Sequence, residues 1–158
     1  MTQQASVHEQ MSHGHTRLIW LLDDIQAHLE GLCEGTDEPE LILEELVSYV
    51  RAFSEELDGH IEEEETDVFP RAEAVGGGDG RQELAELEAE HRSLQAQMKA
   101  FWTILSDACE ISGEGNGTCF DDLLDRVGAI RKELAAHSSH ERAFLTQAEH
   151  QLRESSPG

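Results

Sequence analysis

The sequence predicts an all-α protein that folds as an up-down-up-down antiparallel four-helix bundle. Apolar residues recur at the three- and four-residue spacing of helices, and no segment shows the strict alternation of a strand. The strong breaks are three stretches rich in glycine or proline, at residues 33–39, 70–80 and 112–119. Long helices joined by such short connections pack as antiparallel neighbours in one bundle.

The chain has 158 residues, a length that suits one domain with a single core. We therefore predict one domain over residues 1–158, in which the bundle covers about residues 10–154 and both termini are frayed. The predicted helices cover about residues 11–34, 39–69, 80–111 and 119–154.

Local signals mark where these helices begin and end. The side chains expected to cap helix starts are Asp37, Asp79 and Thr118. Pro70 is expected to end or kink the second helix, because proline lacks a backbone N–H and its ring clashes with the preceding turn. The glycine-rich loop after it is interpreted as a flexible connector, since it lacks the Lys-Ser/Thr pair and the preceding strand of a phosphate-binding loop.

The formal net charge is -23, from 34 acidic and 11 basic residues. Such a negative surface repels phosphate groups and argues against nucleic acid and anionic membranes as partners. No window approaches the length of an apolar membrane span, and the N-terminal sequence does not resemble a secretory signal. Three irregularly spaced cysteines indicate no disulfide framework, although a disulfide between Cys109 and Cys119 stays open. We therefore expect a cytoplasmic protein.

The second predicted helix contains the stretch HIEEEETDVFP. At about 100° per residue, His60 and Glu64 fall within the apolar stripe of this helix. Glu62 and Glu65 fall outside the stripe, and Glu63 lies near its edge. The four consecutive glutamates are therefore not equivalent, and Glu64 is the one predicted to face the core.

The other three helices also direct histidines toward the predicted core. His91 lies within the third apolar stripe, and His15 borders the first. His137 and Glu141, again four residues apart, lie within the fourth. Counted along each helix from the adjoining loop, at about 1.5 Å per residue, these residues stand at nearly the same height. The side chains predicted to converge are His15, His60, Glu64, His91, His137 and Glu141.

A metal site explains this convergence better than an ordinary core does. A single inward histidine is usually a hydrogen-bonded core residue, and a His–Glu pair four residues apart is often a surface pair. Two buried carboxylates without compensation would be strongly destabilising, however. Imidazole and carboxylate ligands without thiolate favour iron or manganese, and six side chains exceed a tetrahedral zinc site. We predict two iron ions (Fe2+ or Fe3+) bridged by Glu64 and Glu141, with manganese or zinc less favoured.

The pattern of these residues resembles a known family. The similar motifs are His15, His60-x-x-x-Glu64 followed by Val-Phe-Pro, Glu90-His91 and His137-x-x-x-Glu141. Over roughly residues 10–152 they resemble the hemerythrin-like, or HHE cation-binding, domain. The resemblance implies a non-haem di-iron centre with an oxo or hydroxo bridge. It also implies that the first two histidines bind one iron, the last two bind the other, and both glutamates bridge.

The chain departs from the oxygen-carrying hemerythrins at two places. Their second histidine on the third helix and their aspartate on the fourth correspond here to Gln95 and Arg142. Some relatives also carry a glutamate where this chain has Ile61. The resemblance is thus to a four-histidine, two-glutamate variant, whose second iron would need water, an exogenous ligand or a further side chain. The candidates for an additional ligand or an outer contact are Glu88, Glu90, Gln95 and His140.

Three classes of function follow from the resemblance. The first is binding or sensing of dioxygen, peroxide or nitric oxide at the di-iron centre, with a role in oxidative stress. The second is an enzyme, either peroxidase-like or catalase-like or acting on nitric oxide, because a missing histidine leaves more exchangeable coordination. The third is storage or delivery of iron. We favour oxygen or peroxide chemistry at a di-iron centre, and both the enzyme question and the protein partner stay open.

Overall fold

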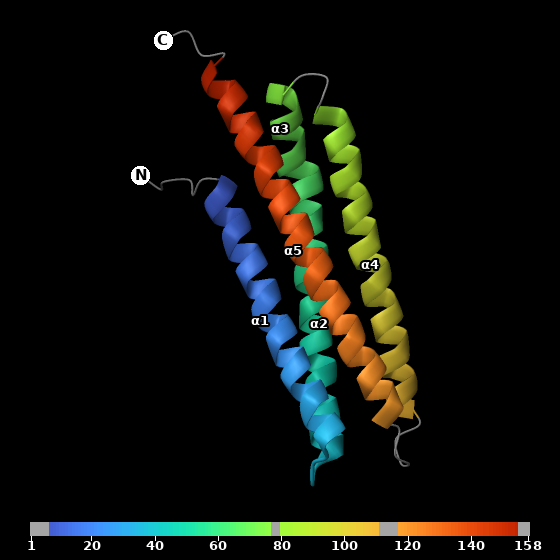
Figure 1. Cartoon of the computed structure of the whole chain (residues 1–158). Helices are drawn as coiled ribbons and strands as arrows, with labels where there is room; N and C mark the ends of the chain where they lie inside the picture. Colours follow the sequence, from blue (N-terminus) through green and yellow to red (C-terminus); the bar gives the residue numbers. More distant parts are fainter. Residues whose placement is uncertain (1–6, 77–79, 111–116, 155–158) are drawn as a thin grey trace.

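A computed structural model describes residues 7–76, 80–110 and 117–154 of the chain. Its elements, in chain order, are α1 (Val7–Glu34), α2 (Pro39–Glu63), the π-helical turn η1 (Glu64–Val68), α3 (Phe69–Gly76), α4 (Gly80–Glu110) and α5 (Gly117–Glu154) (Figure 1). No strand occurs within the described ranges, so the predicted all-α class is confirmed. Of the chain ends predicted to fray, residues 7–9 are helical as the start of α1, and residues 1–6 and 155–158 lie outside the described residues.

Elements α2, η1 and α3 follow one another without a break and form one long rod. Helix α1 packs against α2 and α5, and α4 packs against α5 on one side and the α2–α3 rod on the other. Successive rods run in opposite directions along one axis (Figure 1). The predicted up-down-up-down four-helix bundle is therefore confirmed for the described part of the chain.

Helix α2 begins at the predicted residue, Pro39, but its N-cap lies one residue after the predicted cap. Its N-cap residue is Glu38, whose side chain makes no capping hydrogen bond, so the predicted cap at Asp37 is wrong. A residue before proline avoids the helical conformation, and Glu38 therefore stays outside the helix that Pro39 opens. The backbone N–H of Glu38 donates to Thr36 Oγ1 at 3.2 Å instead. The other two predicted caps, Asp79 and Thr118, lie outside the side chains that the structure describes.

The predicted end of the second helix at Pro70 is also wrong, because the rod continues through this residue as α3, and the alternative of a kink stays a prediction. Just before it, the N–H of Phe69 donates to the carbonyl oxygen of Glu64, five residues back, in the wider π-helical turn. Such a turn already departs from α-helical bonding, so the ring and the missing N–H of Pro70 are accommodated there. The extra residue in the turn also lets Val68 and Phe69 both face the core.

The apolar core consists of two clusters stacked along the bundle. The larger contains Phe53 and Phe101, and the smaller contains Phe69 and Phe144, all almost fully buried. In the last three rods the two clusters end at Ile61 and Val68, at Leu94 and Leu87, and at Leu134 and Phe144. Between these limits lies a level of the bundle whose buried side chains are polar.

Each rod is amphipathic, with one apolar stripe toward the core and a mostly acidic outer face. Arg131 of α5 links the outer faces of α5 and α1. It lies 2.8 Å from Asp23 and donates to Gln26 at 2.9 Å, both on α1. Within the described ranges, no helix combines the length and the apolar character needed to cross a membrane.

Candidate metal centre

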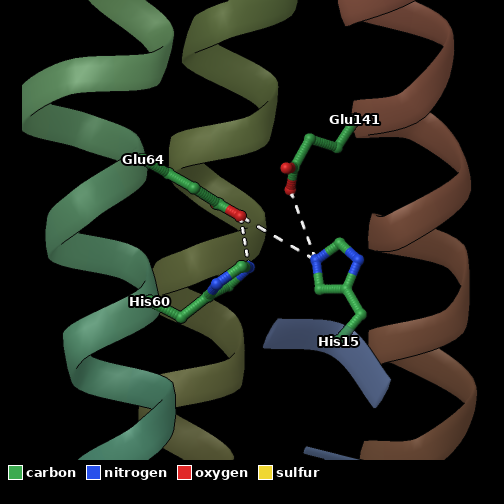
Figure 2. Close-up of side chains that lie close together, drawn as sticks. All are labelled: His15, His60, Glu64 and Glu141. Atoms are coloured by element: carbon green, nitrogen blue, oxygen red, sulfur yellow. Dashed lines mark ion pairs between the residues drawn. The ribbon is translucent and has the colours of Figure 1, made fainter. Parts of the chain in front are cut away.

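The polar level between the two apolar clusters contains four histidines and two glutamates. They come from every rod: His15 from α1, His60 from α2, Glu64 from η1, His91 from α4, and His137 and Glu141 from α5. Four of them are buried to 2 % exposure or less, whereas His15 and His60 are somewhat more accessible. Figure 2 shows His15, His60, Glu64 and Glu141 directed toward one another from three rods. The structure thus brings together all six side chains that the sequence predicts to converge.

The potential ligand atoms form two overlapping groups. Within each group, one ligand atom from every residue lies within 4.8 Å of the others. The groups are His15, His60, Glu64 and Glu141, and Glu64, His91, His137 and Glu141. Both glutamates belong to both groups, whereas each histidine belongs to one. This is the pattern expected when two cations share two carboxylates.

The Glu64 carboxylate faces the two pairs of histidines with different oxygens. Oε1 lies 2.5 Å from His60 Nε2 and 3.8 Å from His15 Nε2. Oε2 lies 2.6 Å from His91 Nε2 and 3.7 Å from His137 Nε2. One oxygen therefore points to each pair, which is the orientation of a carboxylate that bridges two ions.

Glu141 approaches the same centre from α5. Its Oε2 lies 3.0 Å from His137 Nε2 and 3.8 Å from His15 Nε2, so it reaches one histidine of each pair (Figure 2 draws the contact with His15). The Nε2 atoms of His91 and His137 lie 3.1 Å apart. All four histidines thus present Nε2 to the carboxylates.

Most of these inward atoms have no hydrogen-bond partner. The atoms concerned are His15 Nε2, His60 Nε2 and both carboxylate oxygens of Glu64 and of Glu141. Even the short approach between His60 and Glu64 lacks the alignment of a hydrogen bond. Unpartnered buried carboxylates are strongly destabilising. Cations would supply the missing partners, and imidazole nitrogens with carboxylate oxygens are a donor set that fits iron or manganese.

The two carboxyl groups of the centre differ in charge. Burial alone would raise the pKa of Glu64, but the surrounding histidines outweigh burial and hold this pKa well below its usual value. Burial raises the pKa of Glu141, and the nearby Glu64 charge raises it further. Of the two carboxyl groups, Glu141 therefore holds a proton more firmly than Glu64 does.

The histidines also differ in charge. Burial lowers the pKa of His137, but Glu141 and Glu64 outweigh burial and raise it to about 10. Burial lowers the pKa of His60 too, but the adjacent Glu64 carboxylate more than compensates and raises it. For His15, burial prevails and the pKa is lowered. A cation entering the centre must therefore displace protons from some ligands, whereas His15 is ready to bind.

Two further glutamates contact histidines of the centre from outside. His91 Nδ1 donates a hydrogen bond to Glu65 Oε1 at 3.1 Å, and His137 Nδ1 donates to Glu90 Oε1 at 3.1 Å. In a neutral imidazole, a proton on Nδ1 leaves the lone pair of Nε2 free and directed inward. Such outer carboxylates fix the ring orientation and increase the basicity of histidines that bind metals.

Glu65, which the helical phase places outside the apolar stripe, is only partly exposed to solvent. The side chain is 21 % exposed and lies between His91 and Arg92, whose Nη2 donates to both carboxylate oxygens at 2.9 Å. The prediction assumes a uniform α-helical phase, but Glu65 lies in η1, where each residue turns through a smaller angle. Pro70 inside an otherwise helical pattern is the signal in the sequence that the phase changes here.

Two of the four additional candidates lie beside the centre. Glu90 spans two histidines, because its Oε1 accepts from His137 and its Oε2 lies 2.8 Å from His140 Nδ1. On its other side, His140 Nε2 lies 3.9 Å from Glu86, which is exposed. Glu90 and His140 thus link the centre to the surface of α4 and α5.

The structure does not bring the other two candidates to the centre. Glu88 is exposed and belongs to neither group of ligand atoms. Gln95 accepts a hydrogen bond from Arg92 at 2.8 Å and donates one to Asp58 at 3.3 Å. Arg142 is exposed, and Ile61 packs in the larger apolar cluster. The positions that distinguish this chain from oxygen-carrying hemerythrins therefore add no donor to the centre.

Comparison with protein families agrees with this geometry. The family model described as "Hemerythrin HHE cation binding domain" matches residues 6–148, a range that contains all six converging side chains. Comparisons with curated proteins and with solved structures give no significant match. The family match spans most of the chain, and domains of this family bind metal cations. The chain therefore belongs to the hemerythrin HHE cation-binding domain family.

Proposed function

We propose that the chain binds two iron ions at this centre and uses them to bind dioxygen, peroxide or nitric oxide, in oxygen sensing or the response to oxidative stress. In this proposal His15 and His60 would hold one ion and His91 and His137 the other, and both ions would share the two glutamates and a separate oxo or hydroxo group. A cytoplasmic location belongs to the same proposal and is supported by the irregular cysteine spacing.

The observation that carries the proposal is the position of the Glu64 carboxylate. Its two oxygens approach histidines of different pairs at 2.5 and 2.6 Å, without hydrogen-bond alignment. A carboxylate that only neutralised one histidine would have no reason to divide its oxygens in this way. With Glu141 beside it, each ion would receive two imidazole nitrogens and two shared oxygens.

Bound iron would supply redox chemistry and further coordination positions for a small ligand. The chain's own residues orient the imidazoles and keep bulk water away. Phe69 stacks on the His91 ring with centroids 5.5 Å apart and planes inclined by 9°, and Phe144 packs against the edge of Phe69. The larger apolar cluster closes the opposite end. A small uncharged ligand is the kind of molecule that such a buried centre admits.

A second candidate is a di-iron enzyme that turns over peroxide or nitric oxide. Gln95 and Arg142 replace two ligands of the oxygen-carrying hemerythrins. Gln95 is engaged by Arg92 and Asp58, and Arg142 is exposed. The ion at His91 and His137 would therefore keep coordination positions at which small ligands can exchange. Such exchange of ligands favours turnover over stable carriage.

Metal analysis of purified variants tests the centre. The parent chain is expected to retain iron, and Glu64→Ala or His137→Ala should retain well below the parent amount, because each change removes a donor. Glu62→Ala is the matched control, since this exposed glutamate lies two residues before Glu64 and outside both ligand groups. Unchanged iron content and unchanged charge-transfer absorption in the two site variants would refute the assignment.

Stopped-flow mixing of the di-ferrous protein distinguishes the candidate functions. A stable, reversible adduct with dioxygen or nitric oxide supports binding or sensing. Turnover of peroxide or nitric oxide supports an enzyme. Iron that binds but is inert toward all three contradicts both, and leaves storage or delivery of iron as the role of the centre.

A further inference from the structure

We propose that the two ion positions are unequal: Glu65 and Glu90 are positioning residues that make the His91–His137 position fill first, and the His15–His60 position exchanges its ion more readily. This inference rests on the proposed function, because it assumes that cations bind at the six converging side chains.

The two histidine pairs differ in what holds them from outside. His91 and His137 each donate from Nδ1 to a glutamate at 3.1 Å. Among the described residues, no acidic side chain lies within ion-pair distance of Nδ1 of His15 or His60; their acidic contacts are all at Nε2. Only one pair therefore has its rings fixed by carboxylates before any ion arrives.

The outer glutamates are themselves held in place. Arg92 donates to both oxygens of Glu65 and is bound in turn by Gln95 at 2.8 Å, while Gln95 donates to Asp58 at 3.3 Å. Four side chains from α2, η1 and α4 thus support His91. Gln95, at the place of a ligand in oxygen-carrying hemerythrins, therefore has an indirect role in this chain.

Glu90 is held in a different way. It lies between His137 and His140: Oε1 contacts both rings, at 3.1 and 3.2 Å, and Oε2 lies 2.8 Å from His140 Nδ1. Both histidines project from α5 and Glu90 projects from α4, so the contact also fixes how these two helices face each other. A partner on each oxygen restricts the rotation of the carboxylate.

The two histidine pairs also differ in burial, and the pair with outer carboxylate contacts is the more buried one. His91 and His137 have side chains that are 1 % and 2 % exposed, whereas those of His15 and His60 are 14 % and 10 % exposed. The ring of His91 is also covered by Phe69. Solvent therefore reaches the His15–His60 side more easily, which favours exchange of an ion there.

Rigid, correctly oriented ligands bind an ion more tightly, because less side-chain freedom is lost on binding. A carboxylate on Nδ1 also makes Nε2 a stronger donor, and loss of such an outer partner typically weakens metal binding by about 10- to 100-fold. Both effects act on the His91–His137 position alone. The expected order of filling follows from them.

Titration of the metal-free chain with Co2+ alone tests the inference, with visible absorption to follow ligation and native mass spectrometry to count ions. The parent should bind two ions in resolved steps. Glu65→Ala or Glu90→Ala should weaken the tighter step by about 10- to 100-fold. The corresponding Gln variants keep an acceptor for Nδ1–H and should fall between the Ala variants and the parent. The control, Glu62→Ala, removes a nearby exposed charge and should match the parent.

Variants of the histidines assign each step to a position. His15→Ala should lose the weaker step and keep the tighter one, whereas His137→Ala should lose the tighter one. Far-UV circular dichroism of each variant verifies that the helices are retained. Two indistinguishable steps in the parent, or loss of the tighter step in His15→Ala, would overturn the inference while leaving the centre intact. A parent chain that binds no Co2+ and no iron would instead refute the proposed function.

Discussion

Protons and cations compete for the same atoms in this centre. His137 has a pKa raised to about 10 by Glu141 and Glu64, which outweigh the effect of burial. Burial raises the pKa of Glu141, also toward the protonated form. A nitrogen or oxygen that carries a proton cannot bind a cation. The metal-free centre is therefore stabilised by protons that bound ions must replace.

Cation binding should consequently release protons near neutral pH, at least about one per chain from the coupled His137–Glu141 pair. Because both pKa values are raised, the fraction of ligand atoms that carry a proton increases as the pH falls. The apparent affinity for Co2+ should therefore be lower at pH 6 than at pH 8. Isothermal titration in two buffers with different heats of ionisation measures the number released. Identical heats in the two buffers, with affinity independent of pH, would contradict this expectation.

The elements show which parts of the centre follow from sequence and which require the fold. His60 and Glu64 lie four residues apart on an apolar stripe, so α-helical phase alone predicts their inward direction. Glu65 is different, because its contact with His91 depends on the π-helical turn and on α4 lying beside it. A uniform phase cannot predict such a change within one rod.

Contacts between rods were harder to predict than the ligands themselves. The sequence leaves Glu90 as one of four candidates for an additional ligand or an outer contact. Sequence periodicity gives the direction of a side chain but not the residue opposite it on the next helix. Its link to both His137 and His140 depends on how α4 and α5 face each other. The position of the centre along the bundle axis is easier to predict, because the rise per residue and the short loops determine how far each ligand lies from the end of its helix.

Phe69 joins η1 to the smaller apolar cluster and covers His91. Phe69→Ala should lower the free energy of unfolding of the metal-free protein by about 3–5 kcal/mol, because it leaves a cavity beside a buried ring. Trp20→Ala provides an aromatic control: Trp20 is 65 % exposed, and its loss should change stability by about 0.5 kcal/mol or less. Urea denaturation followed by circular dichroism measures both. Equal effects of the two substitutions would show that Phe69 is not a packing residue.

Two features of the whole molecule bear on its stability. A level of buried polar side chains interrupts the apolar core, and the chain has a formal net charge of -23. Both features destabilise the metal-free state, the first through unpartnered buried carboxylates and the second through mutual repulsion. Divalent cations reduce the repulsion among surface charges wherever they bind. Only cations bound at the centre supply partners for the buried carboxylates. Stability measured with and without ions separates the two contributions.

Removal of bound metal should therefore lower the melting temperature more than a change in ionic strength does. A ligand at about 1,000 times its dissociation constant stabilises the folded state by about 4 kcal/mol, which for a chain of this length corresponds to roughly 8–16 °C. Thermal melts of chelated and Co2+-loaded protein measure the shift, and Mg2+ at equal concentration controls for screening of the acidic surface, since it prefers oxygen donors and water. In Glu64→Ala, Co2+ should raise the melting temperature no more than Mg2+ does, because the shared carboxylate is gone. Equal shifts with Mg2+ and Co2+ in the parent would mean that the cations act through surface charge and that the centre contributes nothing to stability.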